Sequence, residues 1–255
     1  MGYGLDCSLV QSAIGAAFRP FNLGFLGGGS GKFQIDVISH FLHEGDVLVH
    51  APEQMSEAQF FADSSAEART FECCEGNYDL LSLVHPADYP GFYDCLGFYG
   101  KMKDQTEAKY DYEDCPGIQN EFGDFAFERN NYEGDIGFSE GEYSYDLQLA
   151  QKDVVDGLCN VYKRIEETGC QVNFSYAPMN YSNLLESQKQ EEIWNLFAAE
   201  LEANLNENGY QSISKVEDYL YPGSYFYDTD YHLTSEGASI RTQRLIEDLR
   251  LAGVF

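Results

Sequence analysis

The feature that most constrains the fold is the alternation of short apolar runs with longer helical patterns. The run Val47-Leu48-Val49 is continuous and apolar, as is typical of a parallel strand that is covered on both faces. A second strand is expected where Val172, Phe174 and Tyr176 alternate before Pro178. Because helical patterns separate these strands, the sequence predicts an α/β fold with a mostly parallel, doubly wound sheet.

The predicted helices are recognised by apolar residues recurring three or four positions apart. A helix within residues 1–18 would be capped by Asp6, and a short strand would follow at 21–24. Further helices are expected over 33–42, over 147–165 with an end at Thr168-Gly169, over 187–206, and from Thr234 or Ser235 onward.

The charge of the chain excludes some partners. With 43 acidic and 15 basic residues the net charge is −28, which argues against nucleic acid and anionic lipid as partners, since both require clustered Lys and Arg.

No run of about 18 apolar residues is present, so no membrane segment is expected, and no secretory signal is seen. The seven cysteines are odd in number and lack zinc-site spacing.

The best candidate for chemistry is His232, which follows an aromatic and acidic stretch and directly precedes a predicted helix. A general base needs such an anchored position, and a nearby carboxylate can fix its tautomer. Asp228 and Asp230 are both close enough along the chain. The alternative is an ordinary surface histidine in an acid-rich chain.

A glycine-rich turn at 27–31 raises a second possibility, a phosphate-binding loop. The sequence there contains no Gly-x-x-x-x-Gly-Lys-Ser/Thr, and no Gly-x-Gly-x-x-Gly with a ribose-binding acid downstream. A nucleotide site is therefore not expected, and a plain tight turn is the simpler interpretation.

The segment around His232 resembles the C-terminal signature of the SGNH (GDSL-type) hydrolase superfamily. It is most similar to the bacterial branch that resembles the D-alanyl transfer protein of teichoic acid modification. The matching residues are Asp228, Tyr231, His232, Leu233, Gly237, Arg241 and Thr242. The resemblance implies that His232 is the base of a catalytic triad and Asp228 its acid, with Asp230 as the fallback. Many relatives place that acid three residues before the histidine, where this chain has Thr229.

Two further segments resemble the same branch. Asn22 and Gly24 match its Asn-Leu-Gly-x-x-Gly run, whose later glycine lends a backbone N–H to the oxyanion hole and corresponds to Gly27. Pro52 and Glu53 stand where many members carry Gly-Asn-Asp, so the usual asparagine donor is replaced, with Glu53 at the substrate-binding position.

The nucleophile is the main departure from the family. Gly4-Leu5-Asp6-Cys7 is similar to the run that follows the nucleophilic serine in relatives. On this alignment the serine and its strand fall before Met1, and strand 2 of the sheet would lose a neighbour. Ser8 is the alternative nucleophile, although it lies within an ordinary helical pattern.

The resemblance implies one SGNH-like domain over 1–255 with three α/β/α layers and flavodoxin-like strand order, carrying an inserted cap or loop region at 85–145. The activity implied is that of a serine esterase or O-acyltransferase that needs no metal or cofactor. Its substrate would be an ester of a cell-envelope glycan or polymer, with an extracytoplasmic location. The alternative is a non-catalytic homologue that binds a glycan or a partner protein.

Overall fold

The computed structural model describes residues 4–24, 31–52, 78–83, 86, 119–130, 150–180, 188–229 and 232–255. Within these ranges the chain mixes helices with short parallel strand pairs, so it has α/β character. The elements are α1 (Cys7–Ile14), α2 (Gly31–Ser39), β1 (Val47–His50), η1 (Tyr78–Leu83), α6 (Lys152–Glu166), β2 (Gln171–Phe174), β3 (Met179–Asn180), α7 (Gln188–Glu207), η5 (Val216–Tyr219), β4 (Leu220–Tyr221), η6 (Gly223–Tyr225) and α8 (Ser235–Leu251).

The described strands all pair in parallel. β1 lies beside β2, from Val47 opposite Gln171 to His50 opposite Phe174. Farther along the chain, Phe174 forms a parallel bridge with Ser212, and β3 then pairs with β4. This confirms the predicted strand at 47–49, a second strand beginning near Val172, and their parallel direction. The second strand ends at Phe174, so the prediction that it continues through Tyr176 to Pro178 is wrong.

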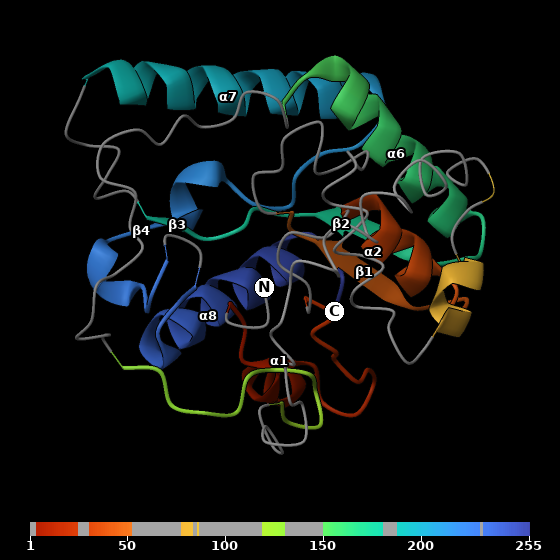
Figure 1. The fold of residues 1–255 in the computed structure, drawn as a ribbon, viewed down its shortest axis with the longest axis horizontal. Helices are drawn as coiled ribbons and strands as arrows, with labels where there is room; N and C mark the ends of the chain where they lie inside the picture. The colour runs from red at the N-terminus through yellow and green to blue at the C-terminus, as the bar shows by residue number, and fades with distance from the viewer. Residues whose placement is uncertain are drawn as a thin grey trace, which may run out of the picture.

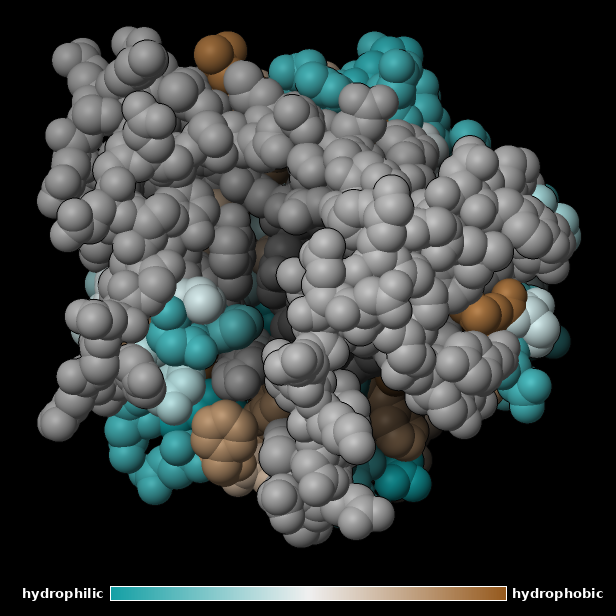
Figure 2. All heavy atoms as spheres, in the orientation of Figure 1, coloured by the Kyte–Doolittle hydropathy of each residue, from teal (hydrophilic) through white to brown (hydrophobic). Residues whose placement is uncertain are grey.

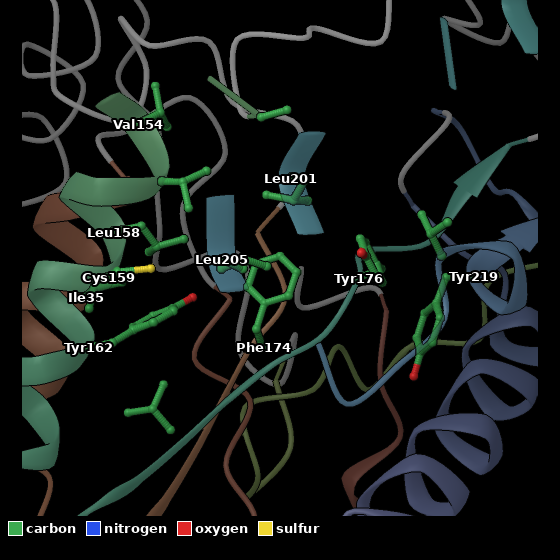
Figure 3. Packing of buried hydrophobic residues seen from close by; sticks show 14 of the residues in the cluster. Ile35, Val154, Leu158, Cys159, Tyr162, Phe174, Tyr176, Leu201, Leu205 and Tyr219 are labelled. Carbon is green, nitrogen blue, oxygen red and sulfur yellow. The ribbon is translucent and has the colours of Figure 1, made fainter. Parts of the chain in front are cut away.

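Helices α6 and α7 cover these strands with the apolar faces that the sequence predicted. Figure 1 shows α6 and α7 on one side of β2 and β3, and α8 with α1 on the other. In the core, Phe174 of β2 points toward Leu201 and Leu205 of α7, while Leu158 of α6 packs nearby (Figure 3). Burial of these side chains stabilises the fold by roughly 25 cal/mol for each Å² of apolar surface removed from water.

Helix α8 is fixed to the segments beside the strands by buried polar contacts, and its side chains Leu245 and Leu249 are buried as well. Arg241, only 1% exposed, donates from Nη2 to the backbone oxygen of Tyr176 (3.2 Å). Farther along the helix, Asp248 accepts a bond from Tyr219 Oη (2.8 Å). Because a buried charge without partners is costly, these bonds define where α8 docks.

The N-terminal helix α1 begins as predicted, with Asp6 as its N-cap. The Asp6 carboxylate accepts bonds from the backbone N–H groups of Ser8 (3.0 Å) and Leu9 (3.3 Å). The helix packs against α8, and the Asp6 N–H donates to Thr242 Oγ1 (2.9 Å). The start of the described chain is therefore attached to the middle of α8.

The strand predicted at 21–24 is wrong, and the helix predicted over 33–42 has a different end. Residues 21–24 form no strand, because the Asn22 N–H donates to Phe122 O (2.7 Å) of a loop and the side chains of Phe21 and Leu23 face solvent. Helix α2 ends at Ser39 rather than continuing to Leu42, and Phe41 is exposed.

Residues 119–130 are the largest described part of the predicted insertion at 85–145. In Figure 1 this segment extends from the beginning of α8 to the region of α1, which it crosses in the view. It contains a tight turn in which Gly123 has φ +83°, and a Cβ there would lie 2.4 Å from Asn22 O. The segment therefore touches both the N-terminal region and the region of His232.

The surface where α6 and α7 meet is polar. Figure 2 shows hydrophilic side chains gathered at the top of the view, where α6 and α7 meet, and Lys152 there pairs with Asp156 (3.4 Å) and Glu207 (2.9 Å). Across the ranges that the structure describes, no helix combines the length and apolar character needed to cross a bilayer.

Candidate functional site

His232 lies on a short loop that closes on itself before α8. Phe226 and Leu233 form an antiparallel bridge at its base, and the Tyr227 N–H donates to His232 O (2.7 Å). The His232 N–H donates in turn to Thr229 Oγ1 (3.1 Å). Both backbone polar groups of His232 are thus engaged, which fixes the direction in which its ring leaves the loop.

Within this loop His232 is paired with Asp228. Its Nδ1 lies 2.7 Å from Asp228 Oδ1, and the two side chains are 32% and 34% exposed. An ionised carboxylate can only accept, so Nδ1 carries the proton and the lone pair of the neutral ring is on Nε2. This is the tautomer that a general base requires.

The first turn of α8 holds the loop in place. Thr234 is the N-cap, because its Oγ1 accepts a bond from the Gly237 N–H (3.1 Å). The Thr234 N–H also donates to Tyr225 O (2.9 Å), which connects the cap to the loop. Gly237 is packed so closely that a Cβ there would lie 2.6 Å from Tyr225 O. The sequence allowed either Thr234 or Ser235 as the cap, and the structure assigns the role to Thr234.

Ser8 and His232 are not joined by a hydrogen bond in the described part of the chain. Ser8 is exposed on α1, where its backbone N–H donates to the Asp6 carboxylate and its carbonyl accepts from the Ser12 hydroxyl. Asp6 is attached to Thr242, which lies seven residues into α8, roughly 10 Å along its axis from the end near His232. Helix α1 is therefore docked beside the middle of α8, away from its first turn.

Asn22 and Gly24 belong to a different cluster from His232. Asn22 is 8% exposed; its Nδ2 donates to Asp124 Oδ1 (2.9 Å) and its Oδ1 accepts from the Gly24 N–H (3.2 Å). The side chain of Asn22 is thus used to hold the N-terminal segment. The remaining predicted positions, Gly27, Glu53 and Asp230, lie outside the described residues.

The centre of that cluster is Asp124, which no sequence pattern singles out. It is 3% exposed and accepts a bond from the Cys7 N–H (2.7 Å) in addition to that from Asn22. Burial, with a smaller contribution from the Asp124 charge, raises the pKa of the Cys7 thiol far above its ordinary value. Burial therefore favours the thiol form of Cys7, which is a weaker nucleophile than the thiolate.

Arg129 is likewise not predicted by the sequence, yet it touches the loop of His232 directly. Its Nε donates to Leu233 O (3.0 Å), and its backbone exchanges bonds with Ser235. Neither Asp124 nor Arg129 stands in a local pattern, because their partners are about a hundred residues distant in the sequence. Only the fold brings them to their partners.

A second histidine, His50, has a different environment. It ends β1, and its Nδ1 is hydrogen-bonded to the hydroxyl of Tyr162 on α6. Burial lowers the pKa of His50 to about 4, so the ring is neutral at physiological pH. A tyrosine partner cannot stabilise an imidazolium as a carboxylate does, so His50 is a poor general base.

The described ranges contain no group of three or more His, Cys, Asp or Glu side chains that could hold a metal ion. No family model matches the sequence, and neither the curated proteins nor the solved structures contain a match. The function must therefore be inferred from the geometry around His232 and from the residues that resemble the SGNH signature.

Proposed function

We propose that the chain is an SGNH-type serine esterase or O-acyltransferase. The observation that best supports this is the His232–Asp228 pair, in which an oriented imidazole is presented from a closed loop at the start of a helix. The residues around it, Leu233, Gly237, Arg241 and Thr242, are those of the resemblance, and each is buried.

In the proposed reaction, Nε2 of His232 removes the proton of a serine hydroxyl as that oxygen attacks an ester carbonyl. Asp228 stabilises the resulting imidazolium, and backbone N–H groups, Gly27 among them, hold the oxyanion. The imidazolium then protonates the departing alkoxide, which leaves an acyl-serine. Water, or a sugar or polymer hydroxyl, takes the acyl group in a second step with the same proton transfers.

The proposal includes the arrangement of the domain in three layers. A three-layer α/β/α domain with a doubly wound sheet is consistent with the parallel β1–β2 and β3–β4 pairs and with helices on both sides of the strands (Figure 1). The substrate, an ester of a cell-envelope glycan or polymer, and the extracytoplasmic location are proposed on the resemblance alone.

A non-catalytic homologue that binds a glycan or a partner protein is the second candidate. It is favoured by the position of Ser8, which lies on α1 beside the middle of α8 and away from the loop of His232. The two candidates differ in one property, the presence of an activated serine.

A fluorophosphonate probe tests this property, because it forms a covalent bond only with an activated serine hydroxyl. The natural full-length protein would be treated, digested and mapped by mass spectrometry, alongside hydrolysis of p-nitrophenyl acetate. We expect one labelled serine, with labelling and hydrolysis both lost in His232→Ala. The matched control is His43→Ala, because that side chain is 84% exposed and belongs to the turn between α2 and β1.

Each outcome decides between the candidates. A label on Ser8 would make Ser8 the nucleophile despite its position on α1. Absence of any label, together with hydrolysis no faster than in His232→Ala, would overturn the enzymatic proposal and favour the binding protein.

A further inference from the structure

We infer that Arg129 is a positioning residue for His232, acting through the backbone on which the histidine stands. The inference rests on the proposed function, because it assigns Arg129 a part in orienting the catalytic base. It is drawn from contacts that connect residues 119–130 to the loop 226–233.

The first contact is made by the guanidinium of Arg129. Its Nε donates to Leu233 O (3.0 Å), the carbonyl of the residue that follows His232, and Arg129 is only 4% exposed. A charge-assisted bond in a buried setting is stronger and more directional than one in water. The peptide between Leu233 and Thr234 is therefore held at one end of the histidine loop.

The backbone of Arg129 makes a second attachment at the first residue of α8. Its N–H donates to Ser235 Oγ (2.9 Å), and its carbonyl accepts from the Ser235 N–H (2.9 Å). Together with the bond to Leu233, these contacts lie on both sides of the N-cap Thr234. Residues 119–130 thus secure the junction from which His232 projects.

The other side of the histidine loop, at Tyr227, is contacted by the aromatic ring of Phe127. Phe127 packs edge to face on Tyr227, with ring centroids 6.4 Å apart, and the Arg129 guanidinium lies 5.7 Å from the Phe127 centroid. Tyr227 is the residue whose N–H bonds His232 O. The same segment therefore contacts both sides of the loop, at Tyr227 and at Leu233.

The guanidinium is suited to this position because it has several donors in a fixed plane. While Nε reaches Leu233, Nη1 donates to Phe125 O (3.0 Å) within the segment itself. A lysine has one compact ammonium group and cannot keep both bonds in the same geometry. Loosening this connection should widen the motion of the loop and weaken the bond between His232 Nδ1 and Asp228.

The test follows the imidazole proton of His232 by NMR and needs no substrate. In Arg129→Met we expect this proton to exchange with water roughly 10- to 100-fold faster than in the wild type, the ratio that corresponds to losing a hydrogen bond to a charged group. Arg129→Lys should show a smaller increase. Arg164→Met is the matched control, because Arg164 pairs with Asp36 (3.0 Å) on α2 and its loss should leave the exchange of the His232 proton unchanged.

A purely structural role for Arg129 predicts a different result. The melting temperature of Arg129→Met would fall while the His232 proton of the folded protein exchanged as in the wild type, and that result would overturn the inference. If Arg129→Met does not fold, Arg129→Lys decides, and exchange equal to the wild type would again refute it. Failure of the fluorophosphonate and hydrolysis tests would overturn the proposed function without altering this exchange measurement.

Discussion

Asp228 and His232 are joined by a hydrogen bond of 2.7 Å, although both side chains keep about a third of their surface exposed. The bond holds Nδ1 protonated, so replacing the carboxylate by an amide should favour the opposite tautomer of the ring. We expect Asp228→Asn to lower kcat about 10⁴-fold, as removal of the corresponding carboxylate does in serine proteases. Steady-state hydrolysis of p-nitrophenyl acetate measures this.

Asp230→Asn is the comparison for this prediction, because Asp230 is the other acid that the sequence places near His232. We expect its kcat to stay near that of the wild type. A larger loss in Asp230→Asn than in Asp228→Asn would transfer the orienting role to Asp230.

Gly237 should be intolerant of a side chain. A Cβ there would lie 2.6 Å from Tyr225 O and 3.2 Å from Leu233 Cδ2, and neither the backbone nor the buried Leu233 can easily move. We expect Gly237→Ala to lower the free energy of unfolding by about 1–3 kcal/mol, as measured by urea denaturation.

Glu236→Ala is the control for that substitution, because Glu236 lies in the same turn of α8 and is exposed. Its stability should remain close to that of the wild type. If Gly237→Ala were equally stable, the close contact between α8 and the loop of His232 would be refuted.

Asp124 should be required for the attachment of the N-terminal segment. In Asp124→Ala, the Cys7 N–H and Asn22 Nδ2 lose their buried acceptor, and each unsatisfied donor costs about 1–3 kcal/mol. We therefore expect a large fall in the urea midpoint. Glu121→Ala, from the same loop, removes only an exposed pair with Arg19 and should unfold at the same urea concentration as the wild type. If Asp124→Ala and Glu121→Ala changed the urea midpoint equally, Asp124 would not have the role assigned to it.

His50 should make the protein less stable in mild acid. Its pKa is lowered to about 4 by burial, while in the unfolded chain it is near the ordinary value of about 6.5. Between these values the unfolded chain binds a proton that the folded chain does not, so the free energy of unfolding falls as the pH falls. The His50 contribution amounts to as much as about 3 kcal/mol.

Urea denaturation at several pH values between 7 and 4 measures this loss. His50→Gln should show a shallower decline with falling pH, since the remaining decline comes from other groups. If the wild type and His50→Gln declined with the same slope, His50 would not be the group responsible.

The helices are predictable because their signals are local. The apolar spacing of Val154, Leu158 and Ile165 in α6 predicts a helix that the structure confirms, and α7 and α8 are recognised in the same way. The strand expected at 21–24 does not form because its apolar side chains are exposed and its backbone bonds a loop instead of a sheet.

The candidate site is predictable only where its parts are close along the chain. His232 and Asp228 are four residues apart, so spacing makes Asp228 a candidate partner together with Asp230, and the resemblance favours Asp228, whereas Arg129 and Asp124 lie in a stretch without periodicity. Their roles arise from hydrogen bonds to Leu233 and Cys7, which are 104 and 117 residues away. Pairings of this length leave no trace in residue spacing.

The attachment of the N-terminal segment to α8 also fixes an order of events during translation. Asp6 bonds Thr242 and Gly4 bonds Arg241, which are 236 and 237 residues apart. At about 5–20 residues per second, the ribosome needs roughly 12–50 s to make the second partner after the first. During that interval the nascent segment around α1 lacks the surface of α8, although its partner Asp124 is made earlier, and it is then that chaperones and proteases have access to the uncovered side of α1.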